Sequence, residues 1–253
     1  MKHLFALAAA FLLPLVPAGA ADSPERVALA TARTDPYTLI GQVFFASGRL
    51  DYLGSGVVIS PNAVLTAGHN LYDRKTGWST EVEFRRGAYG DAVLSEQFAT
   101  RVYLLSGYKA RANHWGGDKA QTFAVDLGGL RFSSPVAEGA HAGWTTDLSR
   151  ISNTTGQKTI IGYGADRPNT GDYPLTVETE RRFHQVRGGF WESAGVYFEG
   201  GMSGGPIFCR DSRGNLLVSG VVVSSTEAPY LAGGVRILNG KGAKLIQKFL
   251  SPE

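Results

Sequence analysis

The chain has 253 residues, of which 43% are hydrophobic and 19% are charged. This composition supports a substantial buried core in one or two compact units and excludes a disordered or fibrous protein. The formal net charge of +3 comes from scattered basic residues with short doublets such as Arg85-Arg86 and Arg181-Arg182, so nucleic-acid binding is not predicted.

The first twenty residues have the order of a secretory signal peptide. Lys2 precedes an apolar run over residues 4–16, and Ala18-Gly-Ala20 is the small-residue pattern that signal peptidase recognises. The apolar run is too short for a transmembrane helix, and Pro14 lies inside it. We therefore expect cleavage after Ala20 and a mature protein that is secreted or periplasmic and has no membrane association.

Residues 21–36 are polar and lack any hydrophobic period. The segment is compatible with a propeptide, for which Arg26 and Arg33 are conceivable processing sites, or with a strap across the body of the protein. Both alternatives remain open at this point.

The rest of the chain predicts an all-β fold. Short runs rich in Val, Ile, Phe and Tyr are separated by glycine-rich turns, which is the pattern of antiparallel strands. The predicted strands cover residues 39–45, 56–59, 82–84, 101–105, 123–131, 159–162, 175–186, 195–198, 216–223 and 234–237. Over residues 241–250, apolar side chains recur at helical spacing and predict one C-terminal helix.

Two distant segments suggest a serine nucleophile and a histidine base. The first reads Val64-Leu-Thr-Ala-Gly-His69, and the second places Ser203 in the run Gly-Gly-Met-Ser-Gly-Gly. A serine hydroxyl is a weak nucleophile, so it needs an imidazole to take its proton and a carboxylate to orient that imidazole. The surrounding glycines permit a tight turn that aims the backbone N–H groups of Gly201 and Ser203 at a developing oxyanion.

The segment Gly201-Met-Ser203-Gly-Gly205 also matches the Gly-x-Ser-x-Gly nucleophile pattern of α/β-hydrolase esterases and lipases. In those enzymes the catalytic histidine follows the serine in the chain. No histidine lies downstream of Ser203, which argues against that fold.

Thr66-Ala-Gly-His69 and Gly201-Met-Ser-Gly-Gly-Pro206 resemble the two signature segments of trypsin-like serine proteases. Two further segments resemble those of the bacterial branch that includes the V8 glutamyl endopeptidase: Ile160-Ile-Gly-Tyr-Gly164 and residues 195–201. The resemblance covers roughly residues 37–250. It implies two packed six-stranded antiparallel β-barrels, over residues 37–135 and 136–253, with the C-terminal helix at the end of the second.

The resemblance also implies where the third member of a catalytic triad lies. In the family, the catalytic aspartate begins a short hydrophobic strand, and Asp126 occupies the similar position here. Asp118 is the nearest competitor, but it lies in a Gly-Gly-Asp-Lys context that is typical of a turn. Asp126 is therefore the predicted partner of His69, with Ser203 as the nucleophile.

The function implied by the resemblance is a secreted serine endopeptidase that acts on protein or peptide substrates through an acyl-enzyme. A catalytically silent secreted binding module on a protease scaffold is the alternative. Trypsin-like zymogens carry an aspartate just before the serine, whereas this chain has Met202, so activation by that ion pair cannot operate. No metal or cofactor motif is present, and the sequence leaves the oligomeric state open.

Substrate specificity is predicted from the positions around the serine. Tyr197 stands where trypsin has an aspartate, and Phe198 and Val222 stand where V8-like relatives read an acidic side chain, so cleavage after Lys, Arg or Glu is not supported. An apolar pocket is expected, and packing of Phe198 and Val222 in the second barrel is the alternative. The residues predicted to form its apolar lining are Tyr197, Phe198 and Val222, and those predicted to form polar or open walls are Ser224, Ser225 and Gly233.

Cys209 is the single cysteine, so no intramolecular disulfide is possible. We expect it to be a packed, inert thiol on a buried strand. Animal trypsin-like enzymes usually carry several disulfides, and Asn70 stands where one of their cysteines follows the histidine, so a bacterial source is favoured.

Overall fold

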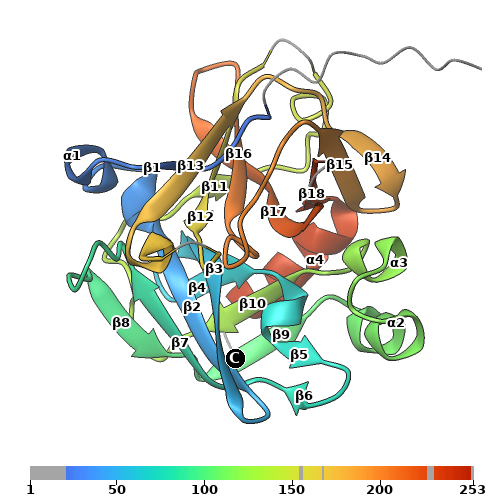
Figure 1. Cartoon of the computed structure of the whole chain (residues 1–253). Coiled ribbons are helices and arrows are strands. Elements are labelled where there is room, and N and C mark those ends of the chain that lie inside the picture. The colour runs from blue at the N-terminus through green and yellow to red at the C-terminus, as the bar shows by residue number, and fades with distance from the viewer. Residues whose placement is uncertain (1–20, 154–155, 167, 227–230, 252–253) are drawn as a thin grey trace, which may run out of the picture.

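The computed structural model describes residues 21–153, 156–166, 168–226 and 231–251, so the predicted signal peptide lies outside the described residues. Two curled sheets lie one above the other in Figure 1. Their strands alternate in side-chain direction, and the apolar faces point inward, as the predicted all-β fold requires. The expected all-β, double-barrel architecture is confirmed, but the predicted six strands in each barrel are wrong: within the described residues the two sheets have seven and nine strands, because short strands add to their edges.

The first sheet has seven antiparallel strands in the order β8-β7-β2-β3-β4-β10-β9. Its core consists of buried β-branched and aromatic side chains, including Val43, Val64 and Phe84. The strands are β2 (Ile40–Ser47), β3 (Leu50–Ser60), β4 (Ala63–Thr66), β7 (Thr80–Arg86), β8 (Ser95–Phe98), β9 (Arg101–Leu104) and β10 (Gly128–Arg131).

The second sheet has nine strands, with the main order β1-β13-β12-β16-β17-β18-β15-β14 and β11 paired with β17. All pairs are antiparallel except β11 with β17. The strands are β1 (Glu25–Arg26), β11 (Gly143–Trp144), β12 (Lys158–Tyr163), β13 (Pro174–Thr179), β14 (His184–Arg187), β15 (Phe190–Ala194), β16 (Pro206–Arg210), β17 (Leu216–Thr226) and β18 (Ala232–Ile237). Cys209 on β16 is buried, and burial raises the pKa of its thiol.

Short elements connect and flank the two sheets. The pair β5 (Tyr72–Asp73) and β6 (Gly77–Trp78) forms a separate hairpin. The helices are α1 (Leu29–Ala32), α2 (Tyr108–Trp115), α3 (Ala120–Phe123) and α4 (Gly240–Leu250), and the 3-10 turns are η1 (Tyr37–Leu39), η2 (Gly68–Asn70) and η3 (Thr170–Asp172). Among the described residues, no helix is long and apolar enough to cross a membrane.

Several predicted strands are wrong in part. The strand predicted over 123–131 begins only at Gly128, because the backbone N–H groups of residues 124–126 bond to carbonyls three or four residues earlier and continue the turn of helix α3 (Ala120–Phe123). The run predicted over 175–186 is two strands, β13 and β14. Residues 195–198 are not a strand; Val196 forms an isolated bridge with Asp22. Helix α2 and strands β4, β8 and β15 were not predicted.

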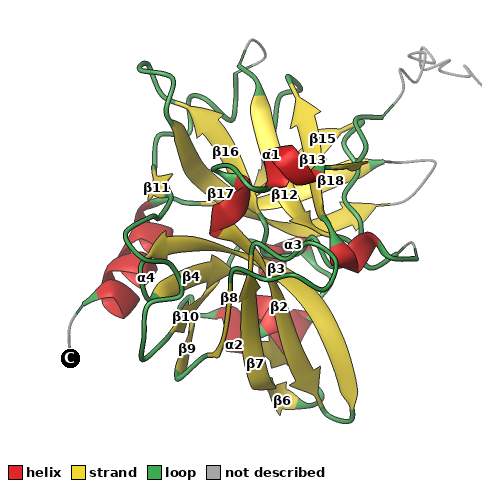
Figure 2. Cartoon of the chain, turned by 90° about the vertical axis from the view of Figure 1, so that its left-hand side faces the viewer, coloured by secondary structure: helices red, strands yellow, loops and turns green. Residues whose placement is uncertain are grey.

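The C-terminal helix α4 is confirmed, but it packs on the first sheet rather than on the second (Figure 2). Phe249 contacts Gly129 and the ring of Tyr103, and Arg131 donates a hydrogen bond to the Phe249 carbonyl at 3.2 Å. Asn239 caps the helix N-terminus through its side-chain oxygen. The end of the chain therefore ties the two halves together.

The N-terminal segment lies along the second sheet. Strand β1 pairs with β13, and Arg26 stacks 3.4 Å above the ring of Tyr173. Asp22 exchanges backbone hydrogen bonds with Gly195 and Tyr197, and its carboxylate accepts hydrogen bonds from the second sheet. Residues 21–27 thus contact the segment that leads to Ser203.

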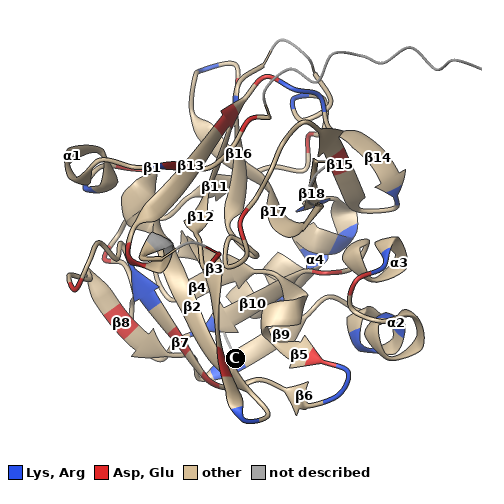
Figure 3. Cartoon of the chain, in the orientation of Figure 1, with Lys and Arg blue, Asp and Glu red and all other residues tan. Residues whose placement is uncertain are grey.

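Charged residues are distributed over both halves of the molecule (Figure 3). Blue and red segments alternate along the ribbon, and the doublet Arg85-Arg86 lies on β7 beside acidic neighbours.

Candidate functional site

His69 and Asp126 meet beside the paired ends of strands β4 and β10 in the first sheet. His69 lies in the 3-10 turn that follows β4, and Asp126 lies between α3 and β10. The carboxylate of Asp126 accepts two hydrogen bonds from His69: one from the backbone N–H at 2.8 Å and one at Nδ1, 2.7 Å away. Two bonds to a single carboxylate fix both the position and the orientation of the imidazole.

Asp126, rather than Asp118, is therefore the carboxylate against the imidazole. Asp126 is fully buried, whereas Asp118 is exposed and pairs with its neighbour Lys119. Gly68 permits the close approach of the turn, since a Cβ there would lie 3.0 Å from Asp126 Oδ1. The side chain of His69 remains 31% exposed, so its other nitrogen is accessible to a reactant.

The charge of Asp126 controls the titration of this pair. Burial lowers the pKa of His69, but the negative charge and the hydrogen bond of Asp126 outweigh it, so the net pKa is raised above its ordinary value. A second buried group lies nearby: Arg236 on β18, whose pKa is lowered to about 10 by burial, against the attraction of Asp126. No pattern in the sequence predicts this buried cation.

Ser203 lies in the loop before β16 and is tied by its backbone to the first sheet. Its carbonyl accepts hydrogen bonds from the Ser55 N–H at 2.8 Å and from Asn70 Nδ2 at 3.0 Å. Because Asn70 is the residue after His69, this contact brings the serine loop to the His69 turn. The Ser203 hydroxyl makes no hydrogen bond to any described residue, so the predicted hydrogen bond between Ser203 and His69 is not formed in this structure.

The glycines around Ser203 are required by close contacts. Gly201 has φ of +87°, and a Cβ on it would lie 2.6 Å from the Tyr163 carbonyl. A Cβ on Gly204 would lie 2.2 Å from the Ser55 carbonyl. The backbone N–H groups of Gly201 and Ser203 donate no hydrogen bond within the described part of the chain, so both are free to bind an oxyanion.

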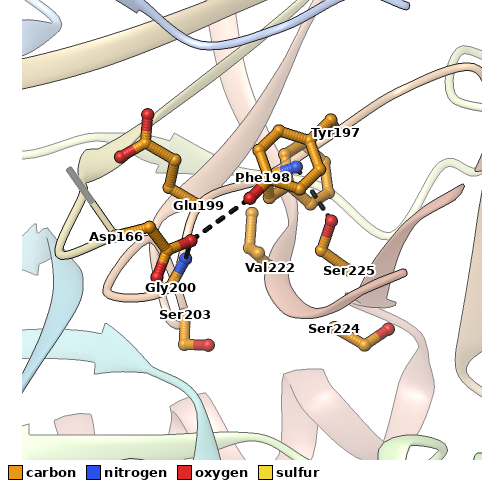
Figure 4. A pocket seen from close by; sticks show the side chains of 9 residues that line it. All are labelled: Asp166, Tyr197, Phe198, Glu199, Gly200, Ser203, Val222, Ser224 and Ser225. Carbon is orange, nitrogen blue, oxygen red and sulfur yellow. Dashed lines mark hydrogen bonds between the residues drawn. The ribbon is translucent and has the colours of Figure 1, made fainter. Parts of the chain in front are cut away.

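A cavity of about 230 Å³ opens beside Ser203 (Figure 4). Five of the six predicted pocket residues line it, whereas Gly233 lies behind Phe198 and is not part of the wall. The full lining is Asp166, Tyr197, Phe198, Glu199, Gly200, Ser203, Val222, Ser224 and Ser225. A second hollow of about 580 Å³ includes His69 in its wall, so a hollow adjoins each of the two groups.

The pocket carries a charge that the sequence did not predict. Asp166 comes from the loop after β12 and adds a carboxylate to the wall, where it accepts a hydrogen bond from the Tyr197 hydroxyl at 3.2 Å. Ser224 adds a hydroxyl group. Asp166 lies far from Tyr197 in the sequence, so no local spacing could have assigned it to the pocket.

Comparison with known proteins gives a family and several structural neighbours. The family model described as Trypsin matches residues 30–235. The chain is similar in structure to a Glu endopeptidase in complex with MPD, with 18% identity, a TM-score of 0.69, and coverage of 90% of this chain and 96% of that one. It is also similar to protease Anisep from Arthrobacter nicotinovorans, with 16% identity, a TM-score of 0.66, and coverage of 84% and 95%.

A third neighbour is the thermostable serine protease AL20 from an extremophilic microorganism, with 16% identity, a TM-score of 0.67, and coverage of 85% of this chain and 98% of that one. No curated protein matches in sequence. At these identities, the structural likeness concerns the fold alone.

Proposed function

Because the chain belongs to the trypsin family of serine proteases, we propose that it is an exported endopeptidase in which Ser203 is the nucleophile, His69 the general base and Asp126 the orienting carboxylate. The observation that carries this proposal is the pair of hydrogen bonds between Asp126 and His69, in a turn that Asn70 links to Ser203. The free N–H groups of Gly201 and Ser203 complete the set of groups that acyl transfer needs.

The reaction proceeds in two steps. Ser203 Oγ attacks the peptide carbonyl while His69 takes its proton, and the oxyanion accepts hydrogen bonds from Gly201 and Ser203 N–H. His69 then gives the proton to the amine nitrogen, the C–N bond breaks, and the amine product leaves while the acyl group stays on Ser203 as an ester. Water hydrolyses this ester by the reverse sequence of proton transfers and regenerates the serine.

Met202 precedes the serine, and its side chain is buried and uncharged. Because it carries no charge, it takes no part in an activating ion pair. The unengaged N–H groups of Gly201 and Ser203 support an oxyanion site that is formed without such a pair. The contacts of residues 21–27 with the second sheet support a strap rather than a removable propeptide. Export rests on the predicted signal peptide, and N-terminal sequencing of secreted protein tests cleavage after Ala20.

The test of the catalytic assignment is covalent labelling with a fluorophosphonate probe. The intact protein should be labelled at Ser203 and should cleave casein, whereas Ser203→Ala should not be labelled. His69→Ala should lose most of its labelling rate, because the serine then lacks its base. An intact protein that binds peptides but neither takes the label nor cleaves them would support the silent binding module instead.

The pocket beside Ser203 supports a substrate preference opposite to that of a glutamyl endopeptidase. An acidic side chain entering it would meet the carboxylate of Asp166, and like charges in contact are strongly unfavourable. A basic side chain would meet an opposite charge and the face of an aromatic ring, Tyr197. This proposed preference replaces the sequence-based expectation that cleavage after Lys or Arg is not supported, because the carboxylate of Asp166 was not part of that expectation. It also differs from the glutamyl preference of the V8-like branch that the sequence resembles.

A peptide library that varies only the residue before the cleaved bond measures this preference. Lys or Arg should be cleaved at least about tenfold faster than Glu, as an unfavourable contact of a few kcal/mol requires. A library in which Glu is the best substrate would contradict this interpretation of the pocket and leave the catalytic assignment intact.

A further inference from the structure

The loop over residues 199–202 holds the predicted oxyanion donor Gly201, and its shape must come from contacts other than an ion pair at Met202. Met202 N–H bonds only within the loop, to the Glu199 carbonyl at 3.1 Å. The loop also exchanges hydrogen bonds with the loop after β12 and with strand β3, and Ser55 on β3 is in turn bonded to strand β12.

The first contact fixes the peptide group between Gly200 and Gly201. The Gly200 carbonyl accepts a hydrogen bond from the Ala165 N–H at 2.7 Å. In a trans peptide the carbonyl and the N–H point in opposite directions. Holding the Gly200 carbonyl against Ala165 therefore directs the Gly201 N–H away from Ala165 and keeps it unpaired for an oxyanion.

The second contact comes from the neighbouring residue. Asp166 Oδ2 accepts a hydrogen bond from the Gly200 N–H at 2.6 Å and one from the Tyr197 hydroxyl at 3.2 Å (Figure 4). Hydrogen bonds to a carboxylate are stronger than those between neutral groups. Ala165 and Asp166 together thus bind both polar backbone groups of Gly200, one from each side.

The third contact comes from the first sheet. Ser55 on β3 is fully buried, and its hydroxyl donates a hydrogen bond to the Gly201 carbonyl at 2.8 Å. The same oxygen accepts a hydrogen bond from the Tyr163 N–H on β12, also at 2.8 Å. A single hydroxyl therefore connects the serine loop to both sheets.

We propose that Asp166 and Ser55 are positioning residues that hold the oxyanion loop in its active shape, and that they replace the activating ion pair that Met202 cannot form. The inference rests on the proposed function, because it concerns the geometry of the same site. Neither residue touches the reacting atoms; each acts through a backbone group of Gly200 or Gly201.

The experiment compares Asp166→Ala, Asp166→Asn and Ser55→Ala with the intact enzyme. Asp166→Ala removes the acceptor for Gly200, whereas Asp166→Asn keeps a side-chain oxygen that can take its place. We expect Asp166→Ala and Ser55→Ala to lower kcat by about 10- to 100-fold with KM changed less than about threefold, since an oxyanion donor acts in the transition state. On a Leu substrate, whose side chain carries no charge for the pocket to recognise, Asp166→Asn should recover at least about tenfold of the kcat that Asp166→Ala loses.

A peptide aldehyde inhibitor supplies a second readout. Its tetrahedral adduct with Ser203 carries the oxyanion, so its inhibition constant should rise in parallel with the loss of kcat. A merely structural contribution would lower the melting temperature without changing kcat and the aldehyde constant together. Asp166 is exposed, so its variants are expected to fold even where Ser55→Ala does not.

Substrates with different side chains before the cleaved bond separate this role from the pocket wall. A loop-positioning role predicts the same loss of kcat in Asp166→Ala for Lys and for Leu substrates. Three outcomes would each overturn the proposal. In the first, kcat falls for Lys substrates alone; in the second, kcat falls equally in Asp166→Asn and Asp166→Ala; in the third, kcat of Asp166→Ala stays within twofold of the intact enzyme. An intact enzyme that neither cleaves peptides nor takes the fluorophosphonate label would instead refute the proposed function.

Discussion

The two sheets contribute to the site in different ways. The first supplies side chains, the imidazole of His69 and the buried carboxylate of Asp126, joined by two hydrogen bonds. The second supplies the hydroxyl of Ser203 and a set of backbone N–H groups, whose directions depend on contacts made by neighbouring peptide groups. A side-chain pair depends on charge and distance, whereas a backbone site depends on loop shape, and the two fail in different ways when mutated.

Removing the nucleophile has the largest expected effect. Without the Ser203 hydroxyl, neither the His69–Asp126 pair nor the backbone N–H groups of the serine loop can promote acylation. Ser203→Ala should lower kcat by roughly a millionfold. Peptide cleavage by highly purified protein measures this, and the melting temperature should stay near that of the intact protein. Turnover within a hundredfold of the intact enzyme would show that another group is the nucleophile.

Asp126→Asn tests the side-chain half. We expect kcat to fall by about 10⁴-fold, because the amide no longer holds the imidazole in the required tautomer. Asp118→Asn is the matched control, since Asp118 is exposed and pairs only with its neighbour, and it should behave as the intact enzyme.

The same variant has a defined pH signature. His69 acts as a base only when neutral, and Asp126 raises its pKa, so the acid limb of kcat/KM should lie above the ordinary value for histidine. Without the carboxylate, the residual activity should reach its plateau at a lower pH. An acid limb that does not move would separate Asp126 from His69.

Gly201→Ala tests the backbone half. The new Cβ would lie 2.6 Å from the Tyr163 carbonyl and would displace the loop, so kcat should fall by about 10²- to 10³-fold. Gly77→Ala carries a similar backbone strain, with φ of +88°, but its Cβ meets no atom within 4 Å. The control should lose stability without losing kcat; equal kinetic losses in both variants would point to general destabilisation.

The smallest expected effect concerns the strap. Asp22 accepts hydrogen bonds from the buried Thr179 at 2.6 Å and from the partly exposed Arg181 at 2.9 Å, and its own side chain is partly exposed to solvent. Asp22→Ala should therefore lower the free energy of unfolding by about 1 kcal/mol. Urea denaturation measures this against Asp118→Ala, which should be neutral. An unchanged Asp22→Ala midpoint would favour the propeptide alternative for residues 21–36.

The sequence by itself determined the all-β class, the C-terminal helix and the identity of the candidate triad. These features rest on local patterns. The strands follow from alternating apolar residues, and the helix follows from helical spacing over 241–250. The candidate catalytic residues follow from the short segments around His69 and Ser203, whose neighbouring residues indicate their chemistry. It also separated Asp126 from Asp118, because apolar neighbours indicate burial. Even so, the strand predicted across Asp126 was wrong, since a turn of helix can satisfy the same apolar pattern.

Only the tertiary structure decided the chemistry of the pocket and the support of the oxyanion loop. Asp166 and Ser55 lie in segments remote from Ser203 along the chain, and their contacts with the serine loop exist only when the two sheets pack. The same applies to helix α4, which follows the second sheet in sequence but buries Phe249 against the first. Sequence periodicity reports which face of an element is buried, but the partner that covers it is set by long-range packing.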